Sequence, residues 1–208
     1  MWNENRTNTA LAGAGARLES PMIGAQALLD ASRTQQSKAF HMRERPFLEL
    51  VNVRGEANDG AFIAAVESVT GARLPIKPNT VAQGKGYDAL WLGPDEWLVR
   101  SDEARTPELE GKLRTALGSL YASVVDVGSG YTVIEVSGER VRDVISRGCP
   151  LDLHPKVLQQ GQCAQSHYFK APIVLVPTAG DTFELIVRRS FSDYFLRILT
   201  DAAAPIVS

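Results

Sequence analysis

The stretch of the chain with the greatest chemical potential covers Leu90–Val99 and reads LWLGPDEWLV. It places an acidic pair, Asp95 and Glu96, at a Gly-Pro corner between Trp91 and Trp97. Two carboxylates in an aromatic pocket could serve as a general acid and a general base. The same residues also suit a hairpin, because proline presets the backbone angle of a type I turn, and glycine and aspartate are frequent turn residues.

The energetics of burial favour the hairpin. Burying one indole removes about 200 Å² from water and contributes about 5 kcal/mol as an upper bound. Burying an unpaired carboxylate costs several kcal/mol. We therefore expect Trp91 and Trp97 to fill a core, and Asp95 and Glu96 to face water. Catalysis or ligand binding at this corner is the alternative.

Histidine and cysteine offer little further chemistry. The three histidines, His41, His154 and His167, lie far apart and belong to no nucleophile or metalloprotease signature. A triad assembled in space is left open. Cys149 and Cys163 have no histidines at metal-ligand spacing, so we expect buried free thiols rather than a zinc site or a disulfide framework. No catalytic and no metal-binding residue is assigned.

Two glycine-rich pieces lack the signature of a phosphate-binding loop. AGAGA at 12–16 and VGSGY at 127–131 miss the G-x-G-x-x-G spacing that places a pyrophosphate on a helix N-terminus. We expect loops, and assign no cofactor-binding residue. Arg188 and Arg189 could pair with carboxylates across an interface, although a solvated strand end is the commoner explanation.

Composition narrows the class of protein. The chain has 208 residues, a net charge of −2, 44% hydrophobic and 22% charged residues, as in an ordinary soluble globular protein. There is no excess positive charge for a nucleic acid, no apolar run of membrane-spanning length and no secretory signal at the start. We expect a cytoplasmic protein with neither nucleic acid nor membrane as partner.

The first 40 residues differ from the rest and predict an extended or partly helical N-terminal arm. Residues 1–20 are polar and small, so they should be mobile unless a partner holds them. Residues 22–37 can form a short helix that is marginal alone. Its expected apolar face consists of Ile23, Ala27, Leu28 and Ala31.

From Arg43 onward the periodicity predicts two passes of similar architecture. The first contains a strand at 46–55, a helix at 60–71 ended by Gly71, the hairpin at the acidic corner and a helix at 107–120 capped by Thr106. The second contains a strand at 131–138, a helix at 138–148, strands at 163–171, 172–177 and 181–188, and a helix at 190–202 capped by Ser190. The last helix should bury Phe191, Tyr194, Phe195, Ile198 and Leu199.

The order of elements predicts an α+β fold with antiparallel sheet. Residues 41–208 would form a single domain built from two pseudo-symmetric β-α-β-β-α type halves, about 43–120 and 121–205. Sequence identity between the halves is thin: Gly55 matches Gly138, and the run from Asp95 matches the run from Asp181.

Several motifs resemble the gamma subunit family of heterotetrameric sarcosine oxidase over nearly the whole chain. These are SPM at 20–22, RPFLELVNVRG at 45–55, LPIKPNTVA at 74–82, LWLGPDEWLV at 90–99, RGCPLDLHP at 147–155 and VRRSFSDY at 187–194. More distantly, residues 124–145 are similar to the opening of the glycine cleavage T protein, a tetrahydrofolate-binding aminomethyltransferase. The resemblance implies the same folate-binding fold.

One departure from the T-protein pattern bears on chemistry. Where that family carries a G-G-x-x-D-D strand with a carboxylate at the folate site, residues 170–175 read KAPIVL. Apolar side chains can neither orient a pterin nor take a proton. The resemblance therefore implies a folate-type fold without folate chemistry.

By resemblance, the chain is a non-catalytic subunit of a complex that oxidatively demethylates sarcosine to glycine, with hydrogen peroxide and 5,10-methylenetetrahydrofolate as products. The resemblance places FAD, FMN, NAD, zinc and tetrahydrofolate in the partner alpha, beta and delta subunits, with the large alpha subunit as the direct contact. The alternative is a stand-alone folate-binding aminomethyltransferase-like protein or folate-dependent regulator.

Overall fold

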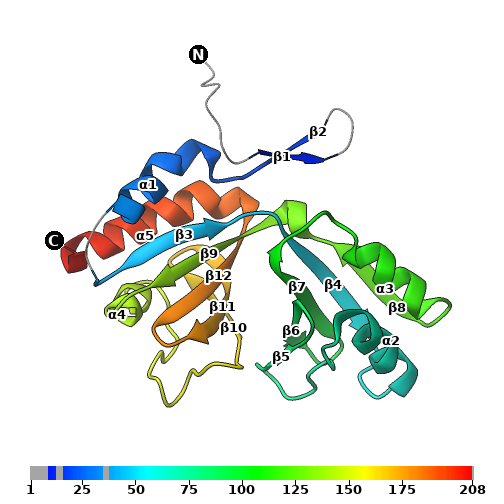
Figure 1. The fold of residues 1–208 in the computed structure, drawn as a ribbon. Coiled ribbons are helices and arrows are strands. Elements are labelled where there is room, and N and C mark those ends of the chain that lie inside the picture. Colours follow the sequence, from blue (N-terminus) through cyan, green and yellow to red (C-terminus); the bar gives the residue numbers. More distant parts are fainter. Residues whose placement is uncertain (1–8, 13–15, 35–37, 208) are drawn as a thin grey trace.

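The computed structural model describes residues 9–12, 16–34 and 38–207 and is built on two five-stranded antiparallel sheets (Figure 1). This confirms the α+β class. Within the described residues, no helix is long and apolar enough to cross a membrane.

The first sheet has the order β5-β6-β7-β4-β8. Helices α2 and α3 cover its outer face, where Phe62 and Trp97 meet with ring centroids 5.8 Å apart. The bounds are β4 Leu48–Gly55, α2 Gly60–Thr70, β5 Val81–Gln83, β6 Tyr87–Gly93, β7 Glu96–Ala104, α3 Leu109–Leu117 and β8 Ala122–Asp126.

The second sheet has the order β10-β11-β12-β9-β3, and its apolar face packs against α1, α4 and α5 (Figure 1). The bounds are α1 Gln26–Thr34, β3 His41–Arg45, β9 Tyr131–Ser137, α4 Val141–Ser146, β10 Ala164–Tyr168, β11 Ala171–Ala179, β12 Thr182–Arg188 and α5 Ser192–Val207. Single 3₁₀ turns, η1 Ile23–Ala25, η2 Gly128–Gly130 and η3 Arg189–Phe191, precede α1, β9 and α5.

The two sheets match strand for strand, but the halves exchange their edge strands. β8 follows α3 and pairs with β4, whereas the matching place beside β9 is filled by β3 from the N-terminal side. The predicted strand at 46–55 is therefore wrong at its start: the chain leaves the second sheet at Arg45 and turns through Phe47 (φ 62°) into the first. The predicted halves, 43–120 and 121–205, assign β8 to the second half. In the structure β8 completes the first sheet.

Between the sheets lies a third apolar cluster, which joins the two halves. Leu50 and Leu98 of the first sheet and Val133 and Ile186 of the second are buried in it. Burial on both faces makes the central strands near-continuous apolar runs.

Helix α2 follows its local sequence signals and α3 does not. The Asp59 carboxylate accepts hydrogen bonds at the N-terminus of α2, and Gly71, with φ 69°, ends it as predicted. The predicted cap of α3 at Thr106 is wrong. The Glu49 carboxylate accepts from the backbone N–H groups of Glu108 (2.5 Å) and Leu109 (2.6 Å), so the helix begins where a residue of β4 caps it.

The C-terminal part of the arm lies against the chain's own core. Met22, Ala25 and Leu29 are buried with α5. Of the expected apolar face, Leu28 packs against this core, but Ala27 and Ala31 are exposed and Ile23 is only partly buried, so the buried face is rotated from the expected one. Before it, β1 Thr9–Ala12 and β2 Ala16–Glu19 form a hairpin. Residues 1–8, much of the segment expected to be mobile, lie outside the described residues, as do 13–15 of the glycine-rich AGAGA.

The final two helices also differ from expectation. α4 is shorter than 138–148, and α5 begins at Ser192 after η3 rather than at a Ser190 cap. Tyr194 is 38% exposed, while Leu196 is buried in its place. The 3₁₀ turn has fewer residues per turn than an α-helix, so it changes which residues of α5 face the core. The hydrophobic periodicity of the sequence does not reveal such a turn.

Replacing Glu49 with alanine should destabilise the fold by about 1–3 kcal/mol, because the buried N–H group of Leu109 and the part-buried N–H group of Glu108 lose their acceptor. Glu49→Gln keeps one acceptor oxygen and should lose less. Urea denaturation followed by circular dichroism measures both. The control is Glu56→Ala on the surface, which should change stability by less than about 0.5 kcal/mol; equal effects at both positions would rule out the capping role.

Candidate functional site

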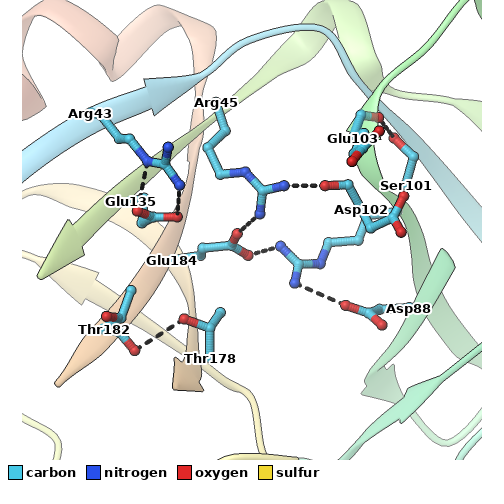
Figure 2. A network of polar contacts seen from close by, with 11 residues as sticks. Arg43, Arg45, Asp88, Ser101, Asp102, Glu103, Glu135, Thr178, Thr182 and Glu184 are labelled. Carbon is cyan, nitrogen blue, oxygen red and sulfur yellow. Dashed lines mark hydrogen bonds and ion pairs between the residues drawn. The ribbon is translucent and has the colours of Figure 1, made fainter. Parts of the chain in front are cut away.

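Four charged side chains form a network between the two sheets, which we call the central ion network: Arg45 of β3, Asp88 of β6, Arg100 of β7 and Glu184 of β12 (Figure 2). Glu184 pairs with both guanidinium groups, and Arg100 Nη2 also donates to Asp88 Oδ2 at 3.0 Å. Arg45 in addition donates to the backbone oxygen of Asp102. The network therefore connects two strands of each sheet.

Sheet register explains why Glu184 needs cations. Glu184 lies directly opposite Glu135 of β9, and like charges in that position repel. Arg43, opposite Glu135 on the other side, forms a two-point ion pair with it, at 2.6 and 2.7 Å. Arg45 and Arg100 neutralise Glu184 in turn. The two acids are tolerated side by side because three arginines surround them.

The central pair of the network, Glu184 and Arg100, is deeply buried. The Glu184 side chain is 0% exposed and that of Arg100 is 5% exposed. Burial lowers the pKa of Arg100, and the neighbouring Asp88 carboxylate opposes that shift. Breaking such a pair from one side leaves an uncompensated buried charge.

Beside the network is a partly open cavity of about 250 Å³ between the sheets. All four network residues line it, together with Asp102, Glu135, Gln83 and Gln160. A cavity lined by both signs of charge can bind and orient a small polar molecule.

A second hollow, of about 510 Å³, lies where the chain passes from β3 of the second sheet to β4 of the first. Its buried carboxylate Glu44 accepts hydrogen bonds from Ser20 Oγ (2.6 Å) and Thr132 Oγ1 (2.7 Å). Burial raises the pKa of Glu44, and the hydroxyl donors reduce that shift. The acids Glu44 and Glu49 hold the arm and α3 in place.

The acidic corner at 95–96 is a hairpin turn between β6 and β7, as expected. Trp97 is fully buried and its Nε1 donates to the backbone oxygen of Pro75 at 2.8 Å, but Trp91 is only partly buried. Asp95 is 61% exposed and pairs with Arg54 at 3.3 Å. The expectation that both acids face water is wrong for Glu96, which is half-buried and accepts from Asn52 Nδ2 at 2.8 Å.

The histidines do not come together. His41 and His167 lie on the two opposite edge strands of the second sheet, and His154 lies in the loop before β10. Cys149 and Cys163 are buried free thiols, as expected, and burial raises the pKa of Cys163 to about 11. Across the described ranges, no group of three or more His, Cys, Asp or Glu residues is placed to hold a metal ion.

The segment 170–175 runs along β11 with Ala171, Ile173 and Leu175 in the core. The segment contains no carboxylate, and the exposed Lys170 is its only polar side chain. Arg188 and Arg189 are both exposed, and Arg189 borders the larger hollow.

Our sequence reasoning missed the central ion network. The available signal was a charge inside an apolar run: Glu184 interrupts FELIV, and Arg100 directly follows WLV. A charge placed in the middle of a buried strand demands a partner.

Comparison with known proteins gives consistent matches. Residues 54–205 match the sarcosine oxidase, gamma subunit family. The chain is 33% identical over 168 residues to sarcosine oxidase subunit gamma of Corynebacterium sp. (strain P-1), covering 80% of this chain and 81% of that one. The corresponding Arthrobacter sp. subunit is 32% identical over 174 residues, covering 82% and 83%.

Solved structures agree with these matches. A chain of the heterotetrameric sarcosine oxidase from Corynebacterium sp. U-96 superposes with a TM-score of 0.84 and 28% identity, covering 92% of this chain and 97% of that one. The glycine cleavage system aminomethyltransferase T from Bartonella henselae gives a TM-score of 0.60 at 10% identity, covering 83% of this chain and 48% of that one. The second match concerns the fold alone.

The stability losses from removing two paired members of the central ion network should not add. Glu184→Met removes one of the two carboxylates that pair with the buried Arg100, together with the carboxylate that pairs with Arg45, and should destabilise the chain by about 3–5 kcal/mol. Glu184→Met combined with Arg100→Met should cost clearly less than the sum of the single variants, as measured by urea denaturation. Arg43→Met, at a more exposed pair, is the control; additive losses would contradict the coupling.

Glu44 should make the fold less stable as pH rises. Its pKa is raised in the folded state, so the folded chain binds more protons there than the unfolded chain, and the free energy of unfolding falls as pH rises through the folded-state pKa. The free energy of unfolding of the wild type, relative to that of Glu44→Gln, should therefore fall as pH rises above the ordinary carboxyl pKa. Chemical denaturation at a series of pH values measures this difference; a difference that does not change with pH would contradict the assignment.

Proposed function

The chain belongs to the sarcosine oxidase gamma subunit family, and on that premise we propose that it is a non-catalytic structural subunit of a sarcosine oxidase complex. The complex would oxidatively demethylate sarcosine to glycine, an oxidoreductase reaction on a CH–NH donor with oxygen as acceptor. Hydrogen peroxide and 5,10-methylenetetrahydrofolate would be its products.

The observation that carries the non-catalytic role is the mutual pairing of the buried charges. Glu184 is paired with two arginines, Glu49 caps α3, and Glu44 holds two hydroxyls. A general acid or base needs a carboxylate that reaches a substrate proton. Groups engaged in holding two sheets, a helix and the arm together support a packing role instead.

The cofactors would lie in the partner subunits. By family resemblance, we propose FAD, FMN, NAD, zinc and tetrahydrofolate in the alpha, beta and delta subunits, with direct contact to the large alpha subunit. The proposed compartment is the cytoplasm. The exposed side chains that could meet a partner include Tyr121, which is fully exposed beside β8.

A stand-alone folate-binding aminomethyltransferase or folate-dependent regulator is the second candidate, favoured by the fold shared with aminomethyltransferase T. The apolar side chains of β11 oppose it, because Ile173 and Leu175 face the core where an acid would be needed.

The full chain purified alone should show no flavin absorbance and no sarcosine turnover, while co-expression with its partner subunits should yield a complex that contains it stoichiometrically. Absorbance, peroxide release and native mass spectrometry measure these outcomes. Calorimetric titration with tetrahydrofolate separates the second candidate: no heat is expected. Bound flavin or stoichiometric folate in the isolated chain would overturn the proposal.

A further inference from the structure

The cavity beside the central ion network is lined by a buried arginine, one of whose N–H groups has no acceptor in the part of the chain that the structure describes. The Arg100 side chain is 5% exposed and lines the cavity. Its Nη2 donates to Asp88 and its Nη1 lies against Glu184, but Nε has no hydrogen-bond partner among the described residues. A buried donor left without an acceptor costs free energy, because it has lost its hydrogen bond to water. A molecule that supplies an oxygen there would recover that cost.

The charge of the wall limits what that molecule can be. Four carboxylates line the cavity, those of Asp88, Asp102, Glu135 and Glu184, against two guanidinium groups. A simple anion at Arg100 Nε would face these carboxylates. A simple cation would leave the Nε–H group without an acceptor.

Neighbouring arginines bring the site as a whole close to neutrality. Arg43 pairs with Glu135 and Arg105 with Asp102, both at 2.6 Å. With these two included, four guanidinium groups balance four carboxylates. A ligand with no net charge, but with both signs on it, leaves this balance intact and satisfies the unpaired donor.

We propose that the cavity beside the central ion network binds a small zwitterionic amino acid. Its carboxylate accepts from Arg100 Nε–H, and its ammonium group faces Asp88 and Glu184. Gln83 and Gln160 also line the cavity, and their side-chain amides would be available to complete its hydrogen bonds.

Cavity size agrees with a small ligand. The volume of about 250 Å³ is below the range of about 300–1,000 Å³ that is usual for drug-sized ligands. It excludes a folate or a dinucleotide, and it admits an amino acid with a short side chain. This binding is separate from the proposed structural role.

Radiolabelled glycine, the smallest such zwitterion, is the probe. Equilibrium dialysis would compare the assembled complex carrying the wild-type chain with the complex carrying Arg100→Lys, which keeps the positive charge but removes the Nε–H group. Sites in partner subunits are common to both and cancel in the difference. We expect one site per chain to weaken at least about tenfold in Arg100→Lys.

Arg54→Lys, at an exposed ion pair with Asp95, is the matched control and should leave that site unchanged. Acetate and methylammonium, each with one charge of the zwitterion, should compete poorly. Equal binding by wild type and Arg100→Lys, or competition by acetate as strong as by glycine, would overturn the proposal.

A structure of the wild-type complex at high glycine concentration gives an independent measurement if Arg100→Lys does not assemble. Ligand density with its carboxylate against Arg100 Nε supports the proposal, and water alone in the cavity overturns it. Assembly, followed by native mass spectrometry, reports on the structural role separately.

Discussion

The structure depends on one buried carboxylate. Glu184 lies at the centre of the second sheet, fully removed from water, and it is stable there only because arginines reach it from two directions. Arg45 comes from its own sheet and Arg100 from the other. The apolar cluster between the sheets would allow them to slide, since hydrophobic contacts are non-directional. A charge that must meet two guanidinium groups fixes their relative position.

The two halves have similar backbones, but their side chains differ at the position of Glu184. Both sheets have the same strand order and both carry an outer layer of helices. In matched hairpins, however, Leu98 of the first half corresponds to Glu184 of the second. At this matched position the first sheet therefore carries an apolar side chain and the second a carboxylate. Repeats that keep their backbone but diverge in side chains can acquire a polar site in this way, without any change of fold.

Local sequence signals predicted elements well and long-range partners poorly. Asp59 and Gly71 fix the ends of α2 because capping acts within a few residues. The start of α3 was misplaced because its cap, Glu49, lies 59 residues away from Glu108. The hairpin at Asp95 was predicted from turn chemistry, whereas the half-burial of Glu96 depends on Asn52 in the next strand. The central ion network was missed for the same reason, since its members are dispersed over four strands.

The exchange of edge strands has a consequence for synthesis of the protein. β3 leaves the ribosome early, but the strand it pairs with, β9, follows much later: Arg43 and Glu135 are 92 residues apart in the chain. Until β9 emerges, β3 has no sheet to join, while the first sheet can assemble as soon as β8 has been made. Such distant pairing gives a high contact order and slow closure. During translation, the nascent N-terminal strand must therefore stay unpaired while the first sheet forms downstream of it.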